Sequence, residues 1–467
     1  MTAKKTVLRR MQMLSTVGAL ALASLTHAQE RAQHLPNMQR FEDPQGEFAT
    51  FNAGGDFDLS NPFFQPLGTN GRACVTCHQP RDAWSLTPHH IQERFFLSGG
   101  RDPLFRPVDG AGCPSADTST FMKRILAYRL LLTKGVLRIE MPLPDNAEFS
   151  VANVDNPYGC SDPQHLSVYR RPLPSTNVVF LSTVMWDGRE TFRNKNIIED
   201  LEDQAVQATL GHAQADHAPS EEQVQQIVDF ETQLFTAQIR DRRAGELDRN
   251  GVQGGPVHLS QTDFYLGIND PLGQNPNGKA FSPEVFRLFS QWFESKQHGN
   301  PRGHAAREAI ARGEQLFDTM PINITGVRGL NDVPLQDGQI HPVIQGFCGT
   351  CHDSPNIGHH SVSAPLDIGL TDATQRTHDL PLITLVNKQT GETIRTSDPG
   401  RALVTGHWDD IGKFKGPILR ALAARAPYFH NGSAATLRDV LNFYDTRFEL
   451  HLTDEQKNDL VAFLNSL

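Results

Sequence analysis

Apolar residues recur at helical spacing in three parts of the chain, which predicts a mostly α-helical fold. The three parts are residues 305–317, residues 460–467 near the C-terminus and residues 224–235 in the middle of the chain. In each, apolar positions three, four and seven residues apart would share one helix face. These positions are Ile310, Gly313 and Phe317; Leu460, Phe463, Leu464 and Leu467; and Val224, Ile227, Val228, Leu234 and Phe235.

Two of these helices carry a start signal. Thr453 is followed three residues later by Gln456, and Ser220 is followed three residues later by Gln223. At this spacing the hydroxyl accepts a hydrogen bond from the third backbone N–H, and the longer side chain reaches back to the capping residue. The pairs therefore predict helices that begin just after residues 220 and 453.

Strand signals are thin by comparison. Residues 382–387 and 392–396 flank Thr390 and Gly391 and predict a small β-hairpin, which we expect to be a flap rather than part of a sheet core. The stretch 240–296 is rich in Gly, Asn and Pro and predicts long loops, so a domain boundary is expected near residue 300. The expected fold contains at most this one hairpin among its helices and loops.

The first 28 residues have the three-part pattern of a secretory signal peptide. Basic residues at positions 4, 5, 9 and 10 precede the apolar run 13–25 and the small residue Ala28. The apolar run is shorter than the roughly 20 residues that span a membrane, so an uncleaved anchor is the weaker interpretation. We expect a soluble, exported protein without membrane insertion, which in a Gram-negative cell would be periplasmic.

Composition and charge exclude several classes of protein. The chain has 467 residues, of which 38% are hydrophobic and 21% charged, so it suits two or three globular domains and fits neither a disordered nor a polytopic membrane protein. The formal net charge is −10, and the mature part has no run of lysine and arginine. Nucleic acid is therefore not an expected partner.

Candidate chemistry comes from a short motif that occurs twice. The pattern Cys-x-x-Cys-His stands at residues 74–78 and again at 348–352. Two thiols at this spacing can add across the vinyl groups of a haem, and the next histidine then lies beneath the iron. A zinc site would need a second cysteine pair nearby, and a redox dithiol would need a thioredoxin-like βαβ pattern; neither is visible.

The motifs therefore predict two covalently bound haem c groups in two similar modules. The modules would be residues 29–300 and 301–467, after a signal peptide at 1–28. The expected attachment residues are Cys74 and Cys77 for the first haem and Cys348 and Cys351 for the second, with His78 and His352 as the iron ligands.

Two further cysteines, Cys113 and Cys160, stand in no motif. An oxidising compartment favours a disulfide between them, which would stabilise a loop-rich haem domain by roughly 3–4 kcal/mol in the chain-entropy account. The alternative is a pair of buried free thiols.

Several other segments now resemble one family, the bacterial di-haem cytochrome c peroxidase and MauG superfamily. The match runs in order from about residue 68 to the end and leaves residues 90–165 and 240–296 uncovered. Its segments are Arg-Arg-Pro-Leu-Pro-Ser-Thr-Asn at 170–177, Met-Trp-Asp-Gly-Arg at 185–189, Asp-Gln-Ala at 203–205 and Ala-Pro-Tyr-Phe-His-Asn-Gly at 426–432.

The resemblance implies two cytochrome c-like domains whose haems face each other across an interface. It places Trp186 between the haems, where it would couple them electronically; the alternative is an ordinary core aromatic. It also places Gln204 beside the peroxide pocket of the first haem, where the neutral amide would hydrogen-bond a bound oxygen species.

The sequence departs from the family pattern at the catalytic acid. The family places a glutamate ten residues after the glutamine, and this chain has Gln214 there, an amide that exchanges no proton at neutral pH. His212 is the nearby side chain suited to acid–base work, and we expect it in the distal pocket. Alternatively, His212 hydrogen-bonds a haem propionate or lies at the surface.

The sequence around the first haem motif departs from the family pattern in a second respect. Typical peroxidases of the family close the resting iron with a loop histidine sixteen residues after the motif, where this chain has Arg94. His89 and His90 are close enough to substitute, but a surface loop is favoured for them. The simpler expectation is an open iron that binds peroxide or oxygen directly.

At the second haem the methionine distribution is informative. All 8 methionines lie at or before Met320, so no residue after His352 can supply the thioether ligand of high-potential cytochromes c. The resemblance places the ligand position at Tyr444, where MauG-type proteins carry tyrosine. A phenolate would lower the iron potential and stabilise its ferric and higher states. The alternative is a core aromatic.

Together these features predict a periplasmic oxidoreductase that activates hydrogen peroxide, or oxygen plus electrons, in the manner of MauG. Its partner would be a small cytochrome c or cupredoxin, or a protein substrate. The alternatives are an ordinary di-haem peroxidase, a pure electron carrier and an oxygenase. Calcium is doubtful, because the family's calcium-binding asparagine is replaced by Arg171.

Overall fold

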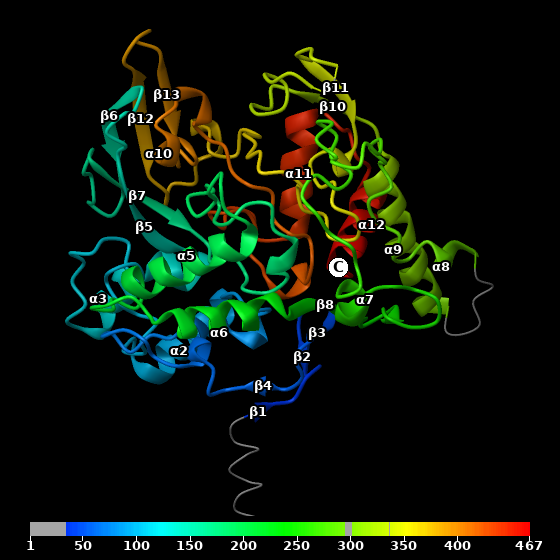
Figure 1. The fold of residues 1–467 in the computed structure, drawn as a ribbon, viewed down its shortest axis with the longest axis horizontal. Coiled ribbons are helices and arrows are strands. Elements are labelled where there is room, and N and C mark those ends of the chain that lie inside the picture. The colour runs from blue at the N-terminus through cyan, green and yellow to red at the C-terminus, as the bar shows by residue number, and fades with distance from the viewer. Residues whose placement is uncertain (1–33, 295–300, 336) are drawn as a thin grey trace, which may run out of the picture.

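The computed structural model describes residues 34–294, 301–335 and 337–467. The expected signal peptide at 1–28 lies outside this part. In Figure 1, α7, α8, α9, α11 and α12 stand on one side of the molecule, and α2, α3, α5 and α6 lie on the other together with α10. The helices are α2 (Pro88–Ser98), α3 (Phe121–Ala127), α4 (Arg129–Lys134), α5 (Ile197–Gly211), α6 (Glu221–Thr232), α7 (Gly255–Leu259), α8 (Gln291–Glu294), α9 (Pro301–Thr319), α10 (Ala402–Thr405), α11 (Leu437–Phe448) and α12 (Asp454–Asn465).

The two capped helix starts are confirmed. Thr453 accepts a hydrogen bond from the N–H of Gln456 at the start of α12, and Ser220 accepts one from Gln223 at the start of α6. The predicted extent of α6 is wrong at its end, because the helix stops at Thr232 and residues 234–241 form a strand. Apolar residues there are buried by pairing with another strand, which local periodicity does not reveal.

The expectation of at most one small hairpin is also wrong, since the described residues form five small sheets. Four are two- or four-stranded and antiparallel, with strand orders β1-β4, β10-β11, β5-β7 and β2-β3-β8-β9. Their strands are β1 (His34–Leu35), β2 (Arg40–Glu42), β3 (Gly46–Asn52), β4 (Phe57–Asp58), β5 (Leu137–Pro142), β7 (His165–Arg170), β8 (Leu234–Asp241), β9 (Gly245–Glu246), β10 (Ile322–Thr325) and β11 (Val343–Gly346).

The predicted hairpin exists, but it is no free flap. Its strands are β12 (Leu382–Asn387) and β13 (Thr393–Thr396), and β12 also pairs antiparallel with β6 (Phe149–Asp155) from the first half of the chain. Ile383 and Leu385 on β12 are fully buried. This three-stranded sheet therefore joins the two halves, as the neighbouring β6, β12 and β13 show in Figure 1.

The core of the second half recruits residues from before position 300. Helices α9 and α12 pack on each other and share one hydrophobic cluster with buried side chains from 244–292, including Phe286 and Phe289. Gly313 permits the close approach of α9 to α12, because a Cβ there would lie 2.1 Å from the carbonyl oxygen of Asp459. The division at residue 300 stays a prediction.

The disulfide between Cys113 and Cys160 is confirmed. It ties the segment before α3 to the loop that follows β6.

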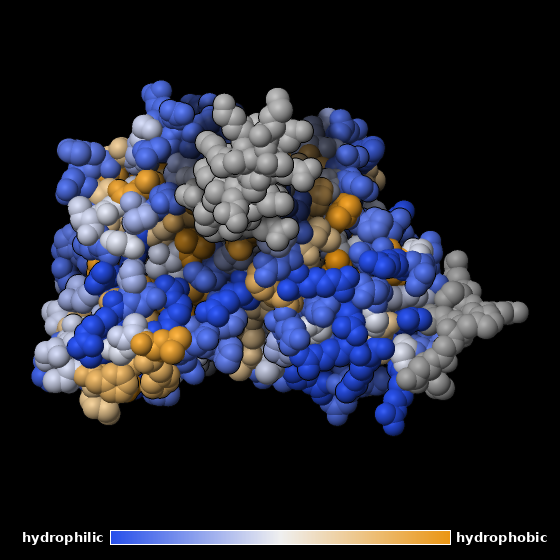
Figure 2. Space-filling view, turned by 90° about the horizontal axis from the view of Figure 1, so that it is seen from below, coloured by the Kyte–Doolittle hydropathy of each residue, from blue (hydrophilic) through white to orange (hydrophobic). Residues whose placement is uncertain are grey.

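Across the residues that the structure describes, no helix is both long and apolar enough to cross a membrane. The face of the molecule seen in Figure 2 is largely hydrophilic.

Candidate functional site

The two cysteine motifs adopt the same local structure. Each begins with a 3-10 turn, Cys74–Thr76 in the first half and Cys348–Thr350 in the second. In both turns the threonine hydroxyl accepts a hydrogen bond from the backbone N–H of the residue before the first cysteine, at 3.0 and 2.9 Å. The side chain of Thr76 or Thr350 thus fixes the turn that presents the two thiols.

The two motif histidines are oriented alike. Nδ1 of His78 lies 3.1 Å from the carbonyl oxygen of Trp84, and Nδ1 of His352 lies 2.8 Å from that of Gly358. Donation from Nδ1 leaves Nε2 free, which is how ligating histidines are oriented in metal sites. Burial lowers the pKa of both imidazoles to about 4, so they are neutral and able to ligate near pH 7.

The four motif cysteines are free thiols in buried surroundings. Burial raises the pKa of Cys77 to about 11 and of Cys348 and Cys351 to about 12, so they are neutral thiols rather than thiolates. In the described part of the chain, no cysteine belongs to a group of three or more residues that could hold a metal ion. The zinc alternative therefore has no support, and thioether attachment suits these thiols.

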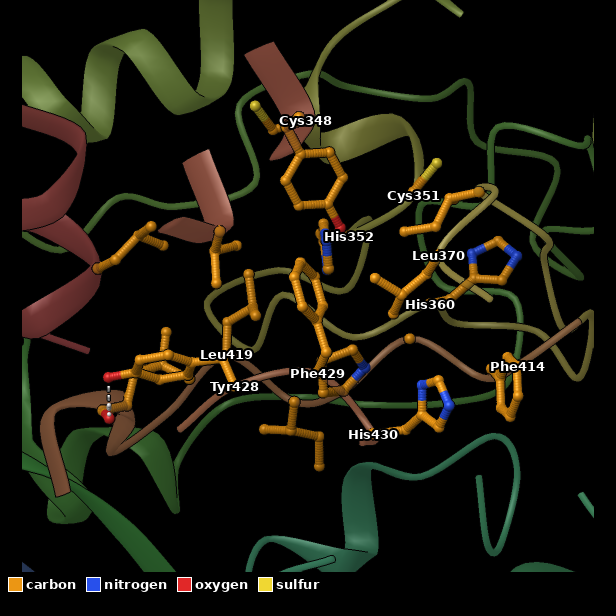
Figure 3. Close-up of a pocket in the computed structure, with 18 of the residues that line it drawn as sticks. Cys348, Cys351, His352, His360, Leu370, Phe414, Leu419, Tyr428, Phe429 and His430 are labelled. Carbon is orange, nitrogen blue, oxygen red and sulfur yellow. Dashed lines mark hydrogen bonds between the residues drawn. The ribbon is translucent and has the colours of Figure 1, made fainter. Parts of the chain in front are cut away.

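A cavity of about 280 Å³ opens beside the second motif. Cys348, Cys351 and His352 line it, and Phe429 and His430, from the loop before α11, lie below them in Figure 3. The remaining wall is mainly leucine, isoleucine and phenylalanine side chains. A mostly apolar space with two thiols and an imidazole suits a haem.

Tyr444, on α11, lines this same cavity. Its ring stacks on Phe448 with the centroids 6.2 Å apart, and its hydroxyl has no hydrogen-bond partner among the described residues. Burial raises the pKa of Tyr444 well above its usual range, so a phenolate would need a cation in the cavity. The position is compatible with the predicted ligand role.

Two imidazole nitrogens fit the polar edge of a haem. Nε2 of His360 and Nε2 of His430 are buried and have no hydrogen-bond partner in the part of the chain described. Both histidines line the second cavity. A buried polar atom without a partner is costly, and a haem carboxylate would satisfy it. The residues present therefore fit the predicted group.

Another cavity, of about 180 Å³, lies beside the first motif and is called the first cavity below, while the cavity beside the second motif is the second cavity. Its lining includes Cys74, Cys77 and His78, together with Gln204 and His212. Gln204 lies on α5, and His212 follows the last residue of that helix. The structure thus brings both predicted pocket residues to the first motif. Gln214, the departure from the family pattern, does not line this cavity.

Sequence reasoning missed three residues beside this cavity. Arg72 and Glu231 line it, and Asp109 lies 2.7 Å from Nδ1 of His212 through its Oδ2 atom. Burial raises the pKa of Glu231 to about 8. Asp109 falls in the stretch 90–165 that the family resemblance does not cover, so no motif could have revealed it.

Trp186 lines both cavities. Its indole Nε1 donates to the carbonyl oxygen of Arg171 at 2.8 Å, and the carbonyl oxygen of Trp186 accepts from the backbone N–H of Lys415 at 2.9 Å. The ammonium of Lys415 lies 5.9 Å from the ring centroid, and the ring of His430 is 6.2 Å away. The predicted coupling residue therefore stands between the two motif cavities.

The residues after Trp186 anchor it to both halves. Asp187 forms a fully buried ion pair with Arg170, and Arg170 also donates to both carboxylate oxygens of Asp398, at 2.7 and 2.9 Å. Gly188 takes a left-handed backbone conformation, with φ of 71°, against the guanidinium of Arg401. This part of the family motif is thus structural.

Arg171 brings a positive charge to the site where the family resemblance would place calcium. Its buried guanidinium donates to the carbonyl oxygens of Lys134, Leu86 and Arg425 at 2.7, 2.8 and 3.1 Å. The guanidinium of Arg171 thus takes up carbonyl oxygens, which are one of the ligand types that bind calcium.

One other group of described residues could hold a cation: Asp270, Asp353 and His360. Asp353 already accepts hydrogen bonds from His360 at 2.8 Å and from the N–H of Ser361 at 2.7 Å. Its carboxylate is therefore satisfied without an ion.

His89 and His90 lie on α2, so the expected loop is wrong, but the expected surface position holds for His89, which is exposed. Nδ1 of His90 is 2.6 Å from a carboxylate oxygen of Asp82, and neither histidine lines the first cavity. Arg94 donates to the carbonyl oxygen of Thr76 at 2.6 Å and so braces the first motif from outside.

Comparison with known proteins gives partial matches. No protein family model matches the chain. It is 31% identical over 213 residues to the cytochrome-c peroxidase IdrP1 of Pseudomonas sp. (strain SCT), covering 40% of this chain and 54% of that protein. It is 29% identical over 121 residues to the cytochrome c551 peroxidase of Pseudomonas aeruginosa, covering 26% and 30%.

The chain thus spans about half the length of the first relative and less of the second. Among solved structures, a MauG-like protein associated with microbial copper homeostasis aligns with 16% identity and a TM-score of 0.32 over 69% of this chain and 79% of the other, a likeness too low to carry an argument. The sequence matches support a relationship to cytochrome-c peroxidases over part of the chain.

Proposed function

We propose that the chain is a periplasmic di-haem c oxidoreductase that acts on hydrogen peroxide, with one haem in each motif cavity. The observation that carries this proposal is the position of Trp186 in the walls of both cavities. An aromatic side chain shared by two haem cavities suits electron exchange between them. Haem iron, when bound, supplies the redox chemistry.

In the first cavity the chain would bind and orient peroxide. The side-chain amide of Gln204 offers two donors and one acceptor for this purpose. His212 would hold or move a proton at Nε2, because Nδ1 faces Asp109. The missing glutamate at position 214 is then replaced by an imidazole on the same segment.

In the second cavity His352 and Tyr444 would both hold the haem iron. A hard anionic ligand favours a low-potential iron, which is a poor entry point for electrons from a high-potential donor. This favours the MauG-like outcome, in which the oxidising equivalents act on a protein substrate. The second candidate is an ordinary peroxidase fed by a small cytochrome or cupredoxin, which the names of the relatives favour.

Stoichiometric peroxide added to the fully oxidised protein separates these candidates. The MauG-like proposal expects an immediate reaction and a long-lived near-infrared absorption band. Trp186→Phe should abolish the band while mass spectrometry still finds two covalent haems on the mature chain. If the oxidised protein ignores peroxide but consumes it once half-reduced by a cytochrome, the ordinary peroxidase is the right function. A chain with one haem, or with zinc, would contradict both.

A further inference from the structure

A buried carboxylate holds the candidate acid–base residue of the first cavity. Oδ2 of Asp109 lies 2.7 Å from Nδ1 of His212, although the two residues are far apart in the sequence. Asp109 is 3% exposed, whereas the His212 side chain is 40% exposed and lines the cavity. The contact therefore runs from the protein interior to the cavity wall.

Arg72 fixes this carboxylate in place. Its Nη1 atom donates to Oδ2 of Asp109 at 2.7 Å and to the carbonyl oxygen of His212 at 3.1 Å. Its Nε and Nη2 atoms donate to the carbonyl oxygens of Pro103 and Leu104 at 2.9 and 2.8 Å. One guanidinium thus ties the loop before α3, Asp109 and the backbone of His212 into one rigid unit.

Asp109 is ionised in this setting. Burial alone would raise the pKa of its carboxyl group, but the hydrogen bond with His212 and the charge and hydrogen bond of Arg72 outweigh burial and lower it. An ionised carboxylate only accepts hydrogen bonds, so the proton in the contact sits on Nδ1 of His212. The Nε2 atom is then the basic nitrogen.

We propose that Asp109 is a positioning residue for His212, which fixes the Nδ1-protonated tautomer so that Nε2 faces peroxide in the first cavity. The inference rests on the proposed function and extends it to a residue outside the family resemblance. Nε2 would take the proton from one peroxide oxygen and return it to the other, which leaves as water when the O–O bond breaks; a bound haem would supply the two electrons for this cleavage and retain the remaining oxygen. Asp109 neither gains nor loses a proton.

The test compares four variants of the haem-loaded protein by kcat/KM for peroxide. Asp109→Asn should lower it about 10- to 100-fold, the usual effect of removing such a partner, and His212→Gln should lower it at least about 100-fold. The double variant should match His212→Gln within about twofold, because Asp109 acts only through His212. Asp43→Asn, which removes the charge of a buried carboxylate bonded to Gln238 outside the cavity, should stay within about twofold of wild type.

A second readout is independent of turnover. In the reduced carbon monoxide form, which is diamagnetic, ¹⁵N-histidine spectra with His212→Gln for assignment should show a proton on Nδ1 of His212. The signal should shift towards a mixture of tautomers in Asp109→Asn. An Nε2-protonated His212 in the wild-type protein would overturn the proposal even if Asp109→Asn failed to bind haem.

Asp109→Asn with wild-type kcat/KM, or a double variant clearly slower than His212→Gln, overturns the positioning role. An equal loss in Asp43→Asn also overturns it, because the effect would then be a general loss of structure. His212→Gln with wild-type kcat/KM contradicts the acid–base step of the proposed function itself, whatever Asp109 does.

Discussion

Glu231, near the end of α6, is a carboxyl group buried against the first cavity. It is 6% exposed, and no described residue forms an ion pair with it. Burial raises its pKa from the usual 4.5 to about 8. Between these values the folded protein keeps a proton that the unfolded chain releases, so this group lowers stability as pH rises from 4.5 to 8.

Glu231→Gln should remove this pH dependence. The amide carries no charge to desolvate, so the variant should be more stable than wild type by about 3 kcal/mol at pH 7 and by little at pH 4.5. Urea unfolding at pH 5 and pH 8 measures the difference. Equal pH slopes for the two proteins would show that Glu231 titrates normally.

Tyr444 provides a second prediction at this scale. Its hydroxyl is unpaired in the second cavity, so Tyr444→Phe should remove an iron ligand without disturbing the stack on Phe448. Electron paramagnetic resonance of the oxidised protein should change from a low-spin tyrosinate signal to a high-spin or water-ligated one.

The control for this experiment is Tyr428→Phe. That hydroxyl also belongs to the second cavity, but it donates to the carbonyl oxygen of Leu422 at 2.9 Å. Its loss should leave the spectrum unaltered. A spectrum that is the same in Tyr444→Phe and wild type would remove Tyr444 from the ligand set.

Site residues were predictable to the extent that chemistry ties them to a motif. The spacing of Cys74, Cys77 and His78 is set by the haem itself, so the sequence alone reveals it. Asp109 is different, because its role depends on a contact with His212 across about 100 residues. Only the folded chain brings the two together.

At the scale of elements, α9 and α12 approach each other closely at Gly313. A Cβ on Gly313 would lie 2.1 Å from the carbonyl oxygen of Asp459 and 2.7 Å from Cβ of Phe463. Since Asp459 and Phe463 are both part of α12, these atoms cannot move aside unless the two helices separate. The glycine is therefore needed for packing, although it weakens the helix itself.

Gly313→Ala should destabilise the protein despite the better helix propensity of alanine. Alanine gains about 1 kcal/mol in propensity, but overpacking of a core costs typically 1–3 kcal/mol and here involves backbone atoms. We expect a net loss of about 1 kcal/mol and a lower Tm by calorimetry. Gly303→Ala, in the same helix, meets only Arg243 O at 3.2 Å and should change Tm much less. Equal effects at both positions would contradict this account.

Elements with local signals were predicted well. The capped helices α6 and α12, the helix over 305–317 and the hairpin of β12 and β13 are all present. The sheet partners were not predicted, because β6 and β8 are recognised by strands distant in sequence and not by their own pattern. This is why the apolar residues after Thr232 were assigned to the wrong element.

At the scale of the whole molecule, one buried arginine connects the two halves. Arg170 pairs with Asp187 beside the shared tryptophan and with Asp398 from the second half. Its side chain is 0% exposed, and that of Asp398 is 4% exposed. A buried charge that loses a partner is costly, because water cannot replace the lost contact.

Asp398→Asn should therefore destabilise the whole protein by about 3 kcal/mol. Both halves should melt together at a lower temperature, which calorimetry and the haem absorption would measure. Asp155→Asn is the matched control, since Asp155 pairs with Arg376 across the same halves but is 58% exposed. Exposed pairs contribute about 0–1 kcal/mol. A similar loss in both variants would contradict the importance of burial.

The pairing of β6 with β12 has a consequence for how the chain is made. β6 is synthesised roughly 230 residues before β12, so it waits with one strand edge exposed while the rest of the polypeptide is completed. Unpaired edges recruit other chains. A polypeptide released early, after residue 300, would carry that edge permanently and should be prone to aggregation, and the full-length chain would depend on chaperones during this interval.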